Sequence, residues 1–68
     1  MITATITPVP GADKVVHLSM WIMDGGVKIW ACEWNLPDAE TARMEADRIA
    51  DRRGEKIEFE EGKNENRM

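Results

Sequence analysis

The chain has 68 residues and a formal net charge of −4, with 43% hydrophobic and 32% charged residues. This length allows one domain, and a chain this short buries only about 60% of its unfolded surface. An enzyme with a deep pocket is therefore disfavoured. The apolar content excludes a disordered chain, and no apolar run approaches the roughly 20 residues of a membrane span.

The N-terminal residues lack a basic start followed by an apolar stretch, so we expect no signal peptide. Cys32 is the single cysteine and has no internal disulfide partner. Both features predict a cytoplasmic protein. The acidic balance disfavours nucleic acid as a partner and suits a basic protein surface.

Three β-strands are predicted in the first half of the chain. Ile2–Thr7 alternates isoleucine and alanine with threonine, which is typical of a half-buried strand, and the loop at 8–13 holds two prolines and a glycine. The apolar runs Val15–Met23 and Val27–Trp34 flank Asp24-Gly25-Gly26. Such a turn between two apolar runs predicts a β-hairpin, because the tight turn needs positive φ.

A helix and a last strand are predicted in the second half. Pro37 suits a first helical turn, Asn35 or Asp38 can cap it, and Gly54 can end it. The residues that share one helical stripe are Ala39, Ala42, Ala46, Ile49 and Ala50. Glu55–Glu61 alternates again. We therefore expect an α+β fold, a single β-β-β-α-β domain over 1–61 with a mainly antiparallel sheet and one helix on one face, followed by a disordered tail at 62–68.

The two faces of the sheet are predicted from strand parity. In a regular two-residue hairpin, even residues of the second strand share a face with odd residues of the third. The helix would then cover an aliphatic face made of Val16, Leu18, Met20, Ile22, Val27, Ile29 and Ala31. The uncovered face would carry His17, Ser19, Trp21, Met23, Lys28, Trp30, Cys32 and Trp34.

This uncovered face is the first candidate binding surface. Trp21, Trp30 and Trp34 are central to it, because tryptophan is enriched in binding hot spots and an exposed apolar patch marks an interaction site. The alternative is that cross-strand tryptophan pairs only stabilise the sheet. The predicted contact residues on this face are Trp21, Trp30, Trp34, His17, Met23 and Lys28.

The solvent side of the helix is the second candidate surface. It carries Met44, an adaptable contact residue, with Asp47 and Asp51. Together with Glu55, Glu58, Glu60 and Glu61 these acidic residues could mimic phosphates for a basic groove, or they could form an ordinary solvated face.

Catalytic and cofactor sites are not predicted. His17 could face Cys32 in one hairpin register, but nothing supplies an orienting group or an oxyanion loop. One histidine and one cysteine do not make a metal site, and Gly25-Gly26 is a turn and not a phosphate loop. We expect no enzyme activity, no cofactor and no metal.

The run from Val15 to Glu60 resembles small phage-encoded proteins with a three-stranded sheet, one helix and a last strand, among them inhibitors of bacterial CRISPR systems. The similarity lies in size, acidic charge, the hairpin Trp21…Asp24-Gly25-Gly26…Trp30 and the helix opening Leu36-Pro37-Asp38-Ala39-Glu40. The same run also resembles small bacterial proteins that consist of a hairpin, an alanine-rich helix and a strand. Arm-binding domains of phage integrases look similar, but they are basic. The resemblance implies an inhibitor that occludes a surface of a larger complex, and no residue role is transferred.

The predicted function is therefore a non-enzymatic protein-binding module, an anti-CRISPR-like inhibitor of a host defence complex acting in the host cytosol. The partner would be a protein, such as a CRISPR effector complex. Two alternatives remain open. One is a homodimer that packs through its tryptophan-bearing sheet face, and the other is a single-stranded nucleic-acid or ligand binder that stacks on the tryptophan residues.

Overall fold

Four strands and one helix follow the predicted order in the computed structural model, which describes residues 1–60. The α+β fold is confirmed. The predicted tail at 62–68 and Glu61, the last residue of the predicted domain, lie outside the described residues. The elements are β1 (Ile2–Pro8), β2 (Val16–Asp24), β3 (Val27–Leu36), α1 (Ala39–Arg53) and β4 (Ile57–Glu60).

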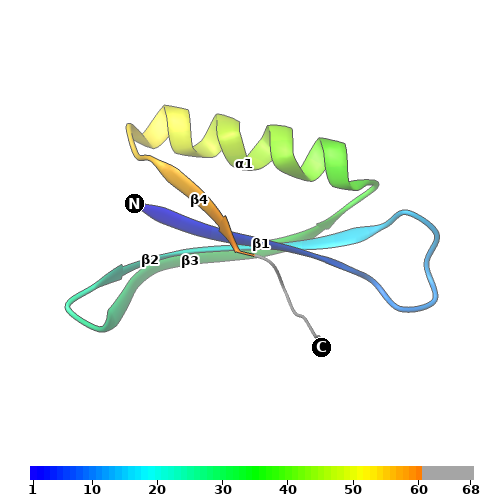
Figure 1. The fold of residues 1–68 in the computed structure, drawn as a ribbon, viewed down its shortest axis with the longest axis horizontal. Helices are drawn as coiled ribbons and strands as arrows, with labels where there is room; N and C mark the ends of the chain where they lie inside the picture. The colour runs from blue at the N-terminus through cyan, green and yellow to red at the C-terminus, as the bar shows by residue number, and fades with distance from the viewer. Residues whose placement is uncertain (61–68) are drawn as a thin grey trace.

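The four strands form one sheet in the order β3-β2-β1-β4 (Figure 1). β1, β2 and β3 are antiparallel neighbours, whereas β4 pairs parallel to β1. This arrangement arises because α1 carries the chain back along the sheet before β4 begins beside the N-terminus. The Met1 ammonium group lies 2.8 Å from a carboxylate oxygen of Glu55, and this contact lowers the pKa of Glu55.

The helix begins after Asp38, one of the two predicted caps, and ends at Gly54 as predicted, but Pro37 precedes the N-cap, so its predicted place in the first helical turn is wrong. Asp38 is the N-cap, and its carboxylate accepts a 2.7 Å hydrogen bond from the backbone N–H of Thr41, which lowers the pKa of Asp38. Gly54 is the C-cap with φ of 69°, a left-handed conformation that glycine adopts without steric cost. Asn35 does not cap, because β3 continues to Leu36.

The hydrophobic core lies between α1 and one face of the sheet. Even-numbered residues of β1 and β2 meet the alanine side of the helix there. Small alanine side chains let α1 approach the sheet closely, and Ile49 is half-buried beside them. Ala39 is exposed, so its predicted place in the buried stripe is wrong. The buried residues are Ile2, Ala4, Val16, Leu18, Met20, Ile22, Ala42, Ala46 and Ala50.

The β2–β3 hairpin turns at Gly25 and Gly26, as predicted. Their φ angles are 59° and 82°, and Asp24 pairs with Val27. Two positive φ angles are typical of the type I′ turn, whose twist matches that of the flanking strands. The first part of the hairpin therefore has the expected register.

A β-bulge then changes the register. Met23 pairs with Lys28, but Ile22 pairs with Trp30, so Ile29 is an extra residue on β3. One inserted residue reverses which face every later side chain occupies, because strand side chains alternate with period two. From Trp30 onwards, even residues of β3 therefore share a face with even residues of β2.

The predicted face of several β3 residues is consequently wrong. Trp30, Cys32 and Trp34 lie on the helix side, opposite Ile22, Met20 and Leu18 in that order, and they pack against the core. Ala31 lies on the other face, opposite Trp21. Ile29, the extra residue of the bulge, was predicted to be covered and is 60% exposed. Val27 precedes the bulge and keeps its predicted face opposite Asp24, but it lies beside the hairpin turn and is 62% exposed. Trp21 and Trp30 are not cross-strand partners, and His17 does not face Cys32.

Candidate functional site

The sheet face that α1 does not cover is called here the open face. Within residues 1–60, no helix or strand lies over it (Figure 1). Its central strands are half-buried by their own neighbours, and its two edges are exposed. The residues of the open face are Thr3, Thr5, Thr7, His17, Ser19, Trp21, Met23, Lys28, Ala31, Glu33, Asn35, Glu58 and Glu60.

Trp21 is the one tryptophan of the open face. It lies on β2 between Thr3 of β1 and Ala31 of β3, two small cross-strand partners that leave its ring half-exposed. The Lys28 Nζ atom lies 5.5 Å from the Trp21 ring centroid, within the range of a cation–π interaction. Trp21 and Lys28 therefore share the open face, as predicted, and they present an indole and an ammonium group together.

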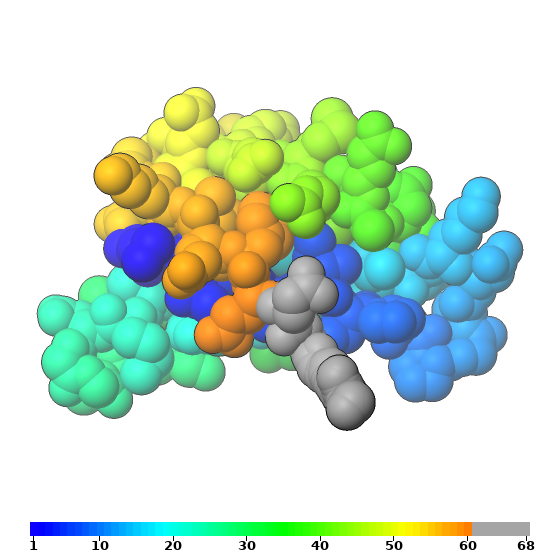
Figure 2. Space-filling model, viewed as in Figure 1, coloured from blue at the N-terminus to red at the C-terminus, as the bar shows by residue number. Residues whose placement is uncertain are grey.

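The hairpin end beside Trp21 is apolar and exposed. Met23 is 49% exposed, and Val27 and Ile29 next to it on β3 are more exposed still. Figure 2 shows this hairpin as a lobe at the left of the molecule, below the helix. Val27 and Ile29 were missed by the sequence analysis, because the regular register placed them under α1.

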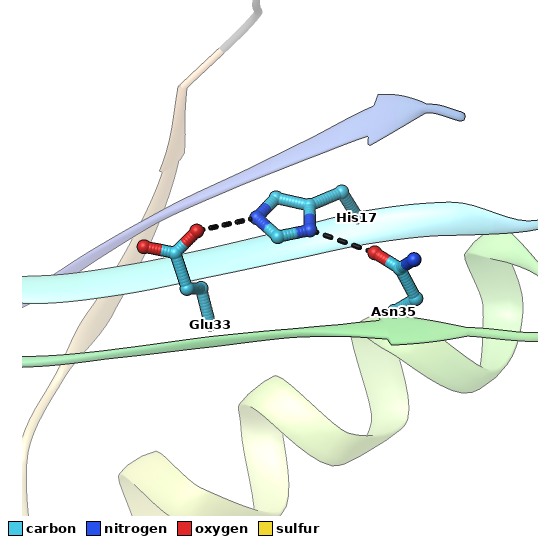
Figure 3. Close-up of polar contacts among 3 residues, drawn as sticks. All are labelled: His17, Glu33 and Asn35. Carbon is cyan, nitrogen blue, oxygen red and sulfur yellow. Dashed lines mark hydrogen bonds and ion pairs between the residues drawn. The ribbon is translucent and has the colours of Figure 1, made fainter. Parts of the chain in front are cut away.

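His17 forms a polar cluster at the other end of the open face (Figure 3). Its Nδ1 atom lies 2.7 Å from Asn35 Oδ1, and its Nε2 atom lies 2.8 Å from Glu33 Oε1. Both partners are acceptors, so the doubly protonated imidazolium satisfies both contacts. The hydrogen bond to Asn35, and then that to Glu33, raises the pKa of His17 above 6.5.

We expect the cluster to make folding weakly dependent on pH. A raised pKa in the folded state means that the stabilisation is complete below pH 6.5, the unperturbed value, and is lost as pH rises through the higher folded value. The side chains are 35% and 67% exposed, so the effect on the free energy of unfolding is at most about 1 kcal/mol. Urea denaturation between about pH 5.5 and 8.5 measures it.

The control for this prediction is His17→Gln, which keeps hydrogen-bonding ability but does not titrate. Its free energy of unfolding should vary less with pH than that of the natural chain over the same range. An identical pH dependence in the two proteins would contradict the assigned role of His17.

Trp30 and Trp34 belong to the helix side and not to the open face. The Arg53 guanidinium lies 4.5 Å from the Trp30 ring centroid, and that of Arg43 lies 4.4 Å from the Phe59 ring centroid. Each of these arginines covers an aromatic ring at the edge of the core, which the small alanine side chains of α1 do not reach. Burial raises the pKa of Cys32, and the nearby charge of Arg53 opposes that shift in part.

The predicted helix surface is exposed and lies away from the sheet. Met44 is 65% exposed, and Asp47 and Asp51 are exposed on the same helix. The nine predicted contact residues thus fall into three places. His17, Trp21, Met23 and Lys28 share the open face, Trp30 and Trp34 lie on the helix side of β3, and Met44, Asp47 and Asp51 lie on the outside of α1.

No group of three or more His, Cys, Asp or Glu side chains in residues 1–60 is arranged to hold a metal ion. None of the helices in that range is long and apolar enough to cross a membrane. No protein-family model, curated protein or solved structure matches this chain.

Proposed function

We propose that the chain is a non-enzymatic protein-binding module that contacts its partner through Trp21 and the adjacent part of the open face. The observation that carries the proposal is that the single helix covers one face of the sheet, so that the other face carries a half-buried Trp21 beside exposed Met23 and Lys28. An indole flanked by an exposed thioether and an ammonium group combines apolar area with a polar handle, the combination typical of binding hot spots.

The charges of the open face favour a protein partner over nucleic acid. Lys28 is its one lysine, whereas Glu33, Glu58 and Glu60 are acidic and exposed. Single-stranded nucleic acid is bound by several stacking aromatics beside a basic groove. With Trp30 and Trp34 on the helix side of β3, the open face has one tryptophan, so the nucleic-acid alternative loses its main support.

The narrower form of the proposal is an anti-CRISPR-like inhibitor that occludes a nucleic-acid-binding or recruitment surface of a host defence complex in the cytoplasm. Its support is the sequence resemblance together with the acidic charge, −4 for the whole chain. Glu58 and Glu60 extend the open face at the β4 edge, where they could meet a basic surface. Protection of an incoming plasmid from CRISPR interference would test this form.

Two surface variants test the binding face. Trp21→Ala removes the indole, and Met44→Ala removes a more exposed apolar side chain from the outside of α1. We expect a tagged chain to co-purify with a partner from its own cell, and Trp21→Ala to weaken that binding at least tenfold while Met44→Ala leaves it unchanged. Affinity purification with mass spectrometry, followed by titration of the purified partner, measures both.

A third variant tests whether the acidic residues on the outside of α1 make the contact instead of the open face. If charge reversal at Asp47 and Asp51 abolished binding while Trp21→Ala had no effect, the outside of α1 would be the contact surface and the proposed face would be wrong. Circular dichroism of each variant ensures that losses are not caused by unfolding.

A further inference from the structure

The outer edge of β3 is the longest unpaired backbone segment of the sheet. β3 is an end strand of ten residues, and its outer side has no pairing strand within residues 1–60. β4, at the other end, has four residues, two of which are glutamates. Short length and charge protect an edge from pairing with another chain, so β4 is protected and β3 is not.

The side chains along β3 do little to oppose pairing. Lys28 and Glu33 are its two charged residues, and their charges cancel. Val27 and Ile29 are apolar and mostly exposed, and Trp30 and Trp34 are only half-buried by α1. β3 contains no proline that would interrupt pairing; Pro37 comes directly after Leu36, its last residue. An edge with these properties is suited to pairing with an extended strand.

The residue pattern of β3 suits a second copy of β3 as that strand. Trp30, Cys32 and Trp34 are symmetric about Cys32, and an antiparallel pair related by a two-fold axis places each residue opposite its mirror position. We propose that two copies of the chain pair antiparallel through β3, with the axis at Cys32, to form a continuous eight-stranded sheet.

In this register Trp30 lies opposite the partner's Trp34, and Ala31 lies opposite the partner's Glu33. Registers with the two-fold axis one residue away on either side are less favourable. An axis at Glu33 places two carboxylates face to face, and an axis at Ala31 places Trp34 opposite the bulged segment at Lys28. The regular part of β3 after the bulge contains all five central residues, so the proposed pairing is undistorted.

The helices leave room for this dimer. α1 packs against all four strands and lies over the middle of the sheet (Figure 1). Two such helices on a continuous sheet would be four strand spacings apart, about 19 Å. Each is about 10 Å wide, so a channel about one helix wide remains between them. Trp30 and Trp34 of both copies lie in this channel, where they cover one another.

Sedimentation velocity from micromolar to millimolar concentration tests the dimer, with a matched pair of variants at Ala31. Ala31 is exposed on the open face, so both variants should fold. Ala31→Glu places a carboxylate opposite the partner's Glu33 twice, whereas Ala31→Lys forms two opposite-charge pairs there. The dissociation constant of the dimer should be about tenfold higher for Ala31→Glu than for Ala31→Lys.

The register is tested by oxidation of Cys32 with diamide, which takes two electrons and two protons from the two thiols as the disulfide forms. Opposed residues of an antiparallel pair have Cα atoms about 4.5–5.5 Å apart, within disulfide reach. We expect a covalent dimer from the natural chain and none from Cys32→Ser. A chain that stays monomeric throughout, equal affinities for the two Ala31 variants, or no covalent dimer would overturn the proposal.

Discussion

Replacing Trp34 with alanine is expected to lower the free energy of unfolding by about 2–4 kcal/mol. The β-bulge turns Trp34 to the helix side, where it lies opposite Leu18 and packs against the core. Its removal leaves a cavity beside a fully buried leucine, in a domain with few other large core side chains. Chemical denaturation followed by circular dichroism gives the change.

The matched variant is Trp21→Ala, which removes the same side chain from the open face. Its neighbours are Thr3, Ala31 and Lys28, so it loses cross-strand packing and one cation–π interaction, about 1 kcal/mol in all. If Trp21→Ala were the more damaging of the two variants, the assignment of Trp34 to the core would be incorrect.

Enlarging Ala46 is expected to have the second large effect. Ala46 is completely buried where α1 meets the sheet, and alanine is what allows the helix to lie close. Ala46→Leu adds three carbons to this contact, which should cost about 1–3 kcal/mol because the helix must move away from the strands. Thermal unfolding and urea denaturation measure the loss.

Ala39→Leu provides the control on the same helix. Ala39 has the helical spacing of the buried alanines, yet it is exposed at the first turn. The substitution should therefore change the free energy of unfolding by no more than about 0.5 kcal/mol. Equal losses in both variants would mean that the first turn of α1 also packs on the sheet.

Local sequence signals predicted the elements well because each depends on neighbouring residues. Gly25-Gly26 needs positive φ, Asp38 caps the nearest N–H groups, and Gly54 adopts the left-handed conformation that ends α1. These preferences act within a few residues and do not depend on the rest of the fold. The parallel pairing of β4 with β1 is different, because it depends on where α1 returns the chain.

The faces of β3 could not be predicted from a regular hairpin because a single extra residue reverses them. A signal was nevertheless present in β3 itself. Val27, Ile29 and Ala31 are apolar at odd positions, while Trp30, Cys32 and Trp34 are apolar at even positions. Apolar residues at both parities, followed by polar Glu33 and Asn35, indicate that the buried parity changes along the strand.

The change of buried parity along β3 explains why the candidate binding surface differs from the predicted one. The sequence predicted a surface of three tryptophans, whereas the structure leaves Trp21 on the open face and adds Val27 and Ile29 at the exposed hairpin end. Arg43 and Arg53, which cover Phe59 and Trp30, were also missed, because a helix–sheet contact at the rim has no local signature.

Cross-strand nuclear Overhauser effects between β2 and β3 test the bulged register most directly. The structure predicts backbone contacts of Leu18 with Trp34 and of Met20 with Cys32. These pairs place Trp34, and with it Trp30, on the helix side of the sheet against the core, and they leave Trp21 on the open face. Contacts of Leu18 with Glu33 and of Met20 with Ala31 would instead show a regular hairpin, with Trp30 and Trp34 on the open face, and would contradict the account.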